Sequence, residues 1–450
     1  MVDIVALLQC TRPHVTATTV RQLSRIIVAI VAMTGRVTMV GLARWAGKGG
    51  SYRTIQRFFA TVIPWGILFW VFFRHYVHCP GEVYLVAGDE VIVTKAGKCT
   101  HGLDRFFASL YGKPVPGLAF FTLSLVSVQA RRSFPMRVEQ VVRSDAEKAA
   151  SKAKAAAKKS KSPCAKRRPG RPKGSKNKSQ ADVPLTPELG RITALLDALL
   201  NLIAGLIPLT YLVLDGHFGN HNALHMARQS HLHLISKLRY DAALYLPYTG
   251  PYAGRGPRRQ YGRKVEAGNM PEKYLQETTV EGHIQTRLYQ AQLLHKEFGQ
   301  PLNVVILAKT NLRTQAQAHV ILFSSDLELT YTQLVDYYSL RFQIELNFRE
   351  AKQYWGLEDF MNLTPTGVTN AANLSLFMVN VAYRLRTDLH PRDPDYSVLD
   401  LKADCRGYKY VEETIKLLPE KPEPVLLGQI LHKVAGLGRI HVFQPSFSFS

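Results

Sequence analysis

The sequence VYLVAGD at Val83–Asp89 is a short apolar run that ends in an aspartate. A second run of this kind, LTYLVLDG at Leu209–Gly216, carries Asp215 in the corresponding place. Continuous apolar runs of this length are typical of strands that are buried on both faces of a sheet. Open α/β sheets place their reacting groups beyond the carboxyl ends of their strands, so we expect Asp89 and Asp215 to lie at one edge of a shared sheet.

The segments around these two runs predict a mixed α/β core. Three more apolar runs favour strands: VIVTKAG directly after the first run, LAFFTLSLVSVQ at Leu118–Gln129, and HLISKLRY at His233–Tyr240. Helical periodicity covers ELGRITALLDALLNLIAGL, which we expect to end at Pro208 because proline cannot continue a helix. A second helix is expected near Asn222–Ser230.

The chain then departs from this alternation. A loop rich in Gly, Pro and Arg at Gly250–Lys264 precedes HIQTRLYQAQLL, NVVILAKT and HVILFSS, three runs that predict strands. We interpret residues 241–330 as an inserted, mainly β subdomain. One long helix is expected at Tyr331–Tyr354 and another around Asn370–Thr387, whereas the pattern does not place the last part of the chain.

The first 80 residues favour helices. The segment TMVGLARWAGKGGSYRTIQRFF contains a short helix, a glycine-rich turn and Ser51 as the N-cap of a second helix, which is helix-turn-helix spacing. The second helix would present Arg53, Gln56 and Arg57, side chains suited to base edges and phosphates. An ordinary helical hairpin fits the same spacing.

The 450-residue chain carries a formal net charge of +23. Such an excess favours a polyanionic partner, because neutralising phosphates releases condensed counterions. Nucleic acid leads over a membrane surface, which would favour an amphipathic helix with a Lys/Arg face, whereas the basic residues here are spread or lie in a linker-like run. The apolar stretches are also too short or too interrupted to span a bilayer. The five scattered cysteines form no C-x-x-C pair, so no zinc site is implied and a reducing bacterial cytoplasm, with nucleoid association, suits the chain.

A basic run at Lys148–Lys178 holds 13 Lys/Arg and no acidic residue. It cannot bury a core, so we expect it to be disordered or loosely helical in isolation. Its centre, KRRPGRPKGSK, resembles an AT-hook, a basic segment that follows the narrow minor groove of A·T-rich DNA. A nonspecific basic linker is the alternative, and only the AT-hook predicts a preference for A·T-rich sequence. The AT-hook contacts would come from Arg168, Gly170, Arg171, Pro172 and Lys173.

The segment YYSLRFQIELNFREAKQYWGLE offers a third carboxylate. On one continuous helix, Tyr338, Arg341, Glu345 and Lys352 would lie within about 60° of one another around the axis. Such a face combines a carboxylate for a metal with two cations and a phenol for phosphate. The alternative is a solvated face joined by i,i+4 ion pairs.

Asp89, Asp215 and Glu345 together suit phosphodiester chemistry. This chemistry uses two divalent cations about 4 Å apart, and carboxylate oxygens are the ligands that Mg²⁺ prefers. Taken singly, an aspartate after a strand is more often a turn or cap residue. The conjunction of the three favours a catalytic site.

The order strand-Asp, basic loop, strand-Asp, β insertion, helix-Glu resembles the insertion-sequence transposases of the insertion-sequence-four group and their relatives. Their signature is Y-(2)-R-(3)-E-(6)-K, and Tyr338, Arg341, Glu345 and Lys352 have this spacing. DGHF, which begins at Asp215, is similar to the second-aspartate region of the group. The resemblance spans roughly residues 83–357.

The resemblance implies an RNase H-like fold and two Mg²⁺ ions, replaceable by Mn²⁺, held by Asp89, Asp215 and Glu345. It implies that Tyr338, Arg341 and Lys352 contact terminal phosphates, and that cleavage and strand transfer occur in a dimeric complex of transposon ends. Some members excise through a DNA hairpin, with a Trp of the β insertion on a flipped base. No Trp lies within residues 241–330, so the hairpin route stays open, although a tyrosine would serve.

We therefore expect an α/β protein with an RNase H-like mixed sheet that acts on double-stranded DNA as a cut-and-paste transposase, with His217 beside Asp215 assisting proton traffic. The alternatives are a metal-dependent nuclease without strand transfer, a transposon-derived DNA-binding protein that no longer catalyses, and a basic architectural protein. The expected divisions are a helical DNA-binding domain (1–80), the first part of the core with the basic loop 148–178 (81–240), the β-rich insertion (241–330), the second part of the core with the Glu helix (331–390), and a C-terminal region for dimerisation (391–450).

Overall fold

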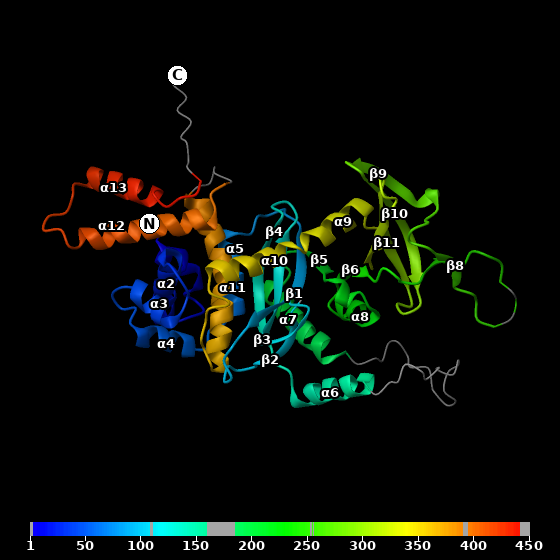
Figure 1. Cartoon of the computed structure of the whole chain (residues 1–450), viewed down its shortest axis with the longest axis horizontal. Coiled ribbons are helices and arrows are strands. Elements are labelled where there is room, and N and C mark those ends of the chain that lie inside the picture. Colours follow the sequence, from blue (N-terminus) through cyan, green and yellow to red (C-terminus); the bar gives the residue numbers. More distant parts are fainter. Residues whose placement is uncertain are drawn as a thin grey trace, which may run out of the picture.

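The computed structural model describes residues 3–108, 111–159, 185–252, 254, 256–389 and 395–441. In these residues, strands join into one mixed sheet of twelve strands. Figure 1 shows the N-terminal helices with α12 and α13 on one side of the central strands and the insertion strands on the other. The AT-hook-like centre of the basic run, from Arg168 to Lys173, lies outside the described residues.

The central part of the sheet has the order β4-β3-β1-β5-β6. Strand β3 is antiparallel to β1 and β4, whereas β5 is parallel to both β1 and β6. The bounds are β1 (Tyr84–Thr94), β2 (Asp104–Ala108, on the outer edge of β3), β3 (Lys113–Ser127), β4 (Arg132–Val141), β5 (Leu209–Val213) and β6 (His233–Leu238).

Strand β1 corrects the expectation of two strands that flank Asp89. It runs unbroken from Tyr84 to Thr94, because β3 pairs with it along its whole length. The parallel neighbour β5, in contrast, pairs with β1 only as far as Ala87↔Val213. Asp89 therefore lies within a strand, but just past the point where that neighbour ends.

Three helices connect these strands: α6 (Asp145–Lys159), α7 (Pro187–Ile203) and α8 (His221–Gln229). Helix α7 ends well before Pro208, because Ala204 takes a left-handed conformation with φ of 48°. Helix α6 holds the beginning of the basic run, and Glu147 in its first turn pairs with Arg191 of α7 at 2.9 Å. This part of the basic run is thus helical, which fits the loosely helical form of the two that we expected for the run in isolation.

The strands of residues 241–330, which we interpret as an insertion, continue the central sheet. Strand β12 pairs with β6 in antiparallel register, from Ile321↔Leu238 to Ser324↔Ile235. The three strands expected here from apolar runs are confirmed as β10, β11 and β12. The bounds are β7 (Leu244–Pro247), β8 (Tyr261–Val265), β9 (Leu275–Glu281), β10 (Ile284–His295), β11 (Pro301–Asn311) and β12 (Gln317–Ser324), with a short 3₁₀ turn η5 (Glu272–Tyr274).

The expected long helix at 331–354 is wrong in one respect, since it is divided into α9 (Tyr331–Leu340) and α10 (Gln343–Tyr354). At the joint the backbone tightens to i→i−3 hydrogen bonds, such as Arg341 N to Tyr338 O at 3.2 Å and Glu345 N to Phe342 O at 3.0 Å. Helix α9 packs on β6 and the insertion strands, whereas α10 packs on β1 and β4. The two helices thus cover different parts of the sheet (Figure 1).

The terminal helices share the main hydrophobic core of the sheet. Phe69 packs against Phe377 with ring centroids 5.4 Å apart, and Phe73 packs against Phe134 of β4 at 5.6 Å. The helices expected in the first 80 residues and around Asn370–Thr387 are confirmed, and two more lie in the last part of the chain, which the pattern did not place. The bounds are α1 (Ile4–Leu7), η1 (Gln9–Thr11), α2 (Ala17–Ala32), α3 (Met39–Trp45), α4 (Tyr52–Ala60), α5 (Trp65–Tyr76), α11 (Pro365–Leu389), α12 (Val398–Ile415) and α13 (Pro424–Gly436).

A buried asparagine joins the N-terminal helices to α11. The Asn370 side chain accepts a hydrogen bond from Trp65 Nε1 at 2.8 Å. It donates to the carbonyl of Phe59, in the last turn of α4, at 2.9 Å and to that of Thr61, just after α4, at 2.7 Å. Only 1% of Asn370 is exposed, so these three groups depend on it for their hydrogen bonds.

Among the described helices, none is by itself long and apolar enough to cross a membrane. Helices α4 and α5 reach the length and apolar composition of a membrane span only when taken together, and they are bent by 99° relative to each other.

Candidate active site

Asp89 interrupts an otherwise apolar face of β1. The alternate residues Leu85, Ala87, Val91 and Val93 are all buried, and they share this face with Asp89 because side chains alternate along a strand. Leu85 and Ala87 belong to the hydrophobic cluster that includes residues of α9. Helix α10 packs on the same strand. Asp89 thus faces the region where α9 gives way to α10.

Asp215 lies beside Asp89 because of the register between their strands. Each aspartate is two residues beyond the last registered pair, Ala87↔Val213, so both carboxylates project past the same point of the sheet. Asp215 caps the short 3₁₀ turn η4 (Gly216–Phe218), and its Oδ1 accepts a hydrogen bond from His217 N at 3.1 Å. Its charge is close enough to raise the pKa of Asp89.

Arg341 joins Asp89 to Glu345. Its Nη1 donates to Asp89 Oδ2 at 2.7 Å, and its Nη2 donates to Glu345 Oε1 at 3.0 Å. The Arg341 side chain is only 15% exposed. Its Nε is buried and has no hydrogen-bond partner among the described residues. One guanidinium therefore joins the carboxylate of Glu345, four residues away in sequence, to that of Asp89, 252 residues away.

Burial and the neighbouring charges shift the pKa values of Asp89 and Arg341. Burial is the largest influence on Asp89 and raises its pKa, as do the charges of Asp215 and Glu345. The Arg341 charge and the Glu90 amide, which donates at 2.8 Å, act in the opposite direction without cancelling this rise. For Arg341, burial lowers the pKa, but the charges of Asp89, Tyr338 and Glu345 outweigh it and keep the guanidinium charged.

The remaining signature residues occupy different surroundings. Tyr338 is half-buried near the carboxylates, and burial raises its pKa, so the phenol keeps its proton. Lys352 is already bound within the protein: its Nζ donates to Ile92 O at 2.8 Å and pairs with Glu358 at 3.0 Å. Arg341 and Glu345 are thus hydrogen-bonded to each other, Tyr338 lies near Arg341, and Lys352 is hydrogen-bonded to β1.

Asp89, Asp215 and Glu345 offer carboxylate oxygens, the type of ligand that a hard divalent cation prefers. In the part of the chain that the structure describes, no group of three or more His, Cys, Asp or Glu side chains is close enough to hold a metal ion. Asp89 and Glu345 instead share one cationic partner, Arg341, and Asp215 lies within electrostatic range of Asp89. Oxygen donors that already hold a positive charge between them have the chemistry that Mg²⁺ or Mn²⁺ requires.

His217 pairs with a residue that the sequence did not single out. Its Nε2 lies 3.3 Å from Glu188 Oε2 of α7, 29 residues away in sequence. The hydrogen bond to Glu188 raises the pKa of His217, and the same bond lowers the pKa of Glu188. The pair links the turn that carries Asp215 to the start of α7.

This pair predicts a pH-dependent contribution to stability. The raised pKa of His217 gives a contribution that is complete below its ordinary value of 6.5 and is lost as pH rises through the raised value. The lowered pKa of Glu188 gives one that is present above 4.5 and is lost in acid. The melting temperature of Glu188→Gln should therefore lie below that of the unchanged protein, most clearly between pH 4.5 and 6.5. The difference should be modest, since both side chains are largely exposed. A difference that persists in alkaline buffer would point to another role for Glu188.

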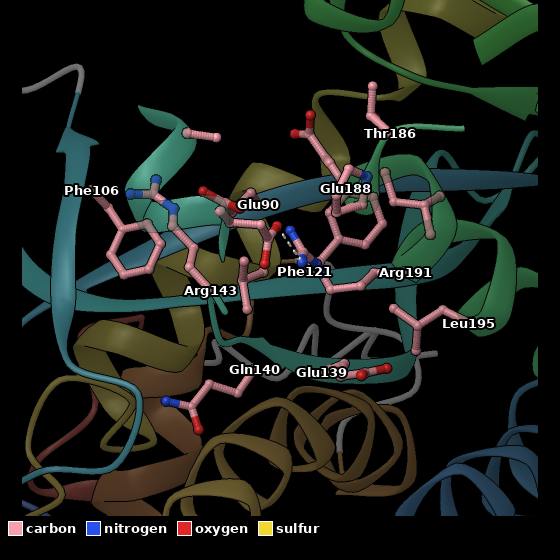
Figure 2. A pocket seen from close by; sticks show the side chains of 15 residues that line it. Glu90, Phe106, Phe121, Glu139, Gln140, Arg143, Thr186, Glu188, Arg191 and Leu195 are labelled. Carbon is pink, nitrogen blue, oxygen red and sulfur yellow. Dashed lines mark hydrogen bonds and ion pairs between the residues drawn. The ribbon is translucent and has the colours of Figure 1, made fainter. Parts of the chain in front are cut away.

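A cavity of about 510 Å³ opens on the opposite face of β1 (Figure 2). Figure 2 shows Glu90, Glu188, Arg143 and Arg191 around it, and the Arg143 guanidinium lies over the Phe106 ring at 4.5 Å. Its charges are mixed and largely paired within the protein, as with Arg191 and Glu147. Because Glu90 rather than Asp89 borders it, this cavity is separate from the carboxylate site.

The predicted DNA-reading residues lie on the outside of α4. Arg53, Gln56 and Arg57 are all exposed, whereas Ile55 and Phe58 are buried. The predicted cap is also present, because Ser51 Oγ accepts a hydrogen bond from Thr54 N at 3.4 Å. The exposed face of α4 is thus available to a partner.

The chain was compared with known protein families. The model of a family described as DDE superfamily endonuclease matches residues 10–295. This interval includes Asp89 and Asp215 and ends before Glu345. No curated protein matches the chain.

Proposed function

The chain belongs to the DDE superfamily of endonucleases, and on this premise we propose that it is a DNA transposase that cleaves transposon ends and joins them to target DNA. Membership supports a nuclease- or transposase-like enzyme with a DNA substrate. The observation that carries the finer proposal is the contact of Arg341 with both Asp89 and Glu345, with Asp215 beside them. The mixed sheet, with β5 and β6 parallel to β1, supports an RNase H-like core.

In this proposal, Asp89, Asp215 and Glu345 hold two Mg²⁺ or Mn²⁺ ions. When bound, such ions activate the attacking oxygen and stabilise the leaving oxygen of a phosphodiester. The apolar residues before and after Asp89 on β1 keep solvent from one side of the site. Arg341 and the protonated Tyr338 would orient the scissile phosphate, and Lys352 would hold α10 against β1 while facing the nucleic-acid backbone.

We propose two DNA-binding surfaces from the positive charge of their side chains and, for α4, from the exposure of those side chains. The exposed face of α4, with Arg53, Gln56 and Arg57, suits a major groove. The AT-hook-like segment from Arg168 to Lys173 would add minor-groove contacts. Y-R-E-K spacing supports membership of the insertion-sequence-four group, and with it a dimeric DNA complex in which residues 391–450 contribute to dimerisation.

A cleavage and joining assay tests the proposal. Duplexes taken from the DNA that flanks the gene should be nicked at one terminal position with Mg²⁺ and left intact with EDTA. A pre-cleaved end with a free 3′-hydroxyl should then be joined to a supercoiled plasmid. Nicking without joining would favour the metal-dependent nuclease, and binding with neither reaction would favour a non-catalytic DNA-binding protein.

A further inference from the structure

We infer that Arg341 and divalent cations compete for the same two carboxylates, Asp89 and Glu345, and that a DNA phosphate ends this competition by binding the guanidinium. The inference rests on the proposed role of these carboxylates as metal ligands. It adds that cation binding and DNA binding depend on each other through a single side chain.

The competition follows from which atoms are engaged. Two different nitrogens of Arg341 reach one oxygen of Asp89 at 2.7 Å and one of Glu345 at 3.0 Å. A cation bound by both residues would need oxygens of the same two carboxylates at about 2.1 Å. A guanidinium between these carboxylates would then be close to a second positive charge, so it has to move away when the cation binds.

The surroundings of Arg341 favour such a movement. Its buried Nε has no partner in the described part of the chain, so one of its donors is unused in this position. Its backbone lies at the joint between α9 and α10 and belongs to neither helix. Glu345, at 42% exposed, leaves that side of the site accessible to solvent and ligands.

A phosphate is the partner that the freed side chain suits. Arginine presents paired N–H donors that match two phosphate oxygens, and phosphate contacts are the main determinant of DNA affinity. Tyr338 lies one helical turn earlier, near Asp89 and Asp215, and burial raises the pKa of its phenol, so the retained proton offers a second donor. A phosphate that binds Arg341 would release Asp89 and Glu345 for the cation, and linkage requires the two affinities to rise by the same factor.

Titration of Mn²⁺ into the full-length protein tests this coupling, with binding followed by calorimetry and by the electron paramagnetic resonance signal of free Mn²⁺. Arg341→Gln should bind Mn²⁺ about 5- to 150-fold more tightly than the unchanged protein when no DNA is present. Adding an end duplex should tighten Mn²⁺ binding to the unchanged protein by a similar factor and have little effect on Arg341→Gln. Equal or weaker Mn²⁺ binding by Arg341→Gln would overturn the inference.

Two further variants make the result specific. Arg349→Gln removes an exposed cation from the outside of α10 and should leave Mn²⁺ affinity unchanged. Asp89→Asn combined with Arg341→Gln should abolish the gain in affinity. If the gain survives in this double variant, the ion binds elsewhere and the proposed metal site itself fails, which is distinct from a failure of the competition alone.

Arg341→Lys covers the case in which Arg341→Gln does not fold. A lysine keeps the charge but lacks the paired nitrogens that reach both carboxylates. It should therefore give an Mn²⁺ affinity above that of the unchanged protein, and a larger rise in melting temperature with Mn²⁺. An unchanged response to Mn²⁺ in this variant would contradict the competition.

Discussion

Replacement of Asp89 by asparagine should reduce end cleavage by at least about 10³-fold, because metal ions supply several kcal/mol of transition-state stabilisation and each 1.4 kcal/mol corresponds to a factor of ten. Asparagine keeps the shape of the side chain but removes the charge and turns one oxygen into an N–H donor. Asp215→Asn and Glu345→Gln should have effects of the same order. Rates of strand nicking in excess enzyme with Mg²⁺ measure all three.

Glu90→Gln is the matched control for Asp89→Asn. Glu90 is the next residue of β1, but its side chain borders the cavity on the opposite face. It should cleave at close to the rate of the unchanged protein. Binding of the end duplex and the melting temperature should be measured for each variant, so that a loss of cleavage is separated from a loss of folding. Near-normal cleavage by any of the three carboxylate variants would remove that residue from the site.

Asn370→Ala should lower the free energy of unfolding by about 3 kcal/mol, since a buried group that loses its hydrogen-bond partner costs about 1–3 kcal/mol. The substitution leaves Trp65 Nε1 and the carbonyls of Phe59 and Thr61 without the partner they have in the structure. It also leaves a small cavity under α5. Urea unfolding followed by tryptophan fluorescence and by circular dichroism measures the change.

Asn201→Ala is the control for this stability prediction. Asn201 lies on the exposed side of α7, and alanine has a higher helix propensity than asparagine, so its unfolding free energy should stay the same or rise slightly. A loss of less than 1 kcal/mol in Asn370→Ala would mean that water or a rearranged turn replaces the lost hydrogen bonds.

The sequence was informative where packing acts on continuous apolar runs. It predicted β1, β3, β5 and β6 in the centre and β10, β11 and β12 in the insertion, although not their lengths. It missed β2, β7, β8 and β9. It also missed β4, because Pro135 and charged residues interrupt the apolar pattern. Proline is tolerated there since, among the described strands, β4 pairs with β3 alone and has a register irregularity at that position.

The candidate site depended on information that local patterns do not hold. The apolar runs predicted one strand before Asp89 and another after it, but nothing local indicated that the two form a single strand, because that continuity depends on pairing with β3. Helical spacing grouped Tyr338, Arg341, Glu345 and Lys352 on one face, but the joint at Arg341 divides that face between two helices. Two hydrogen bonds are tertiary contacts that no sequence periodicity indicates. They join Arg341 to Asp89 and Lys352 to the Ile92 carbonyl.

The pairing of β12 with β6 has a consequence for fragments of this protein. A chain that stops near residue 240, or one from which the insertion is deleted, would expose the backbone donors and acceptors of β6 that β12 now satisfies. Unprotected strand edges of this kind recruit strands from other molecules and lead to aggregation. Recombinant pieces that keep β6 therefore need β12 as well, because β12 pairs with the edge of β6 that would otherwise be exposed.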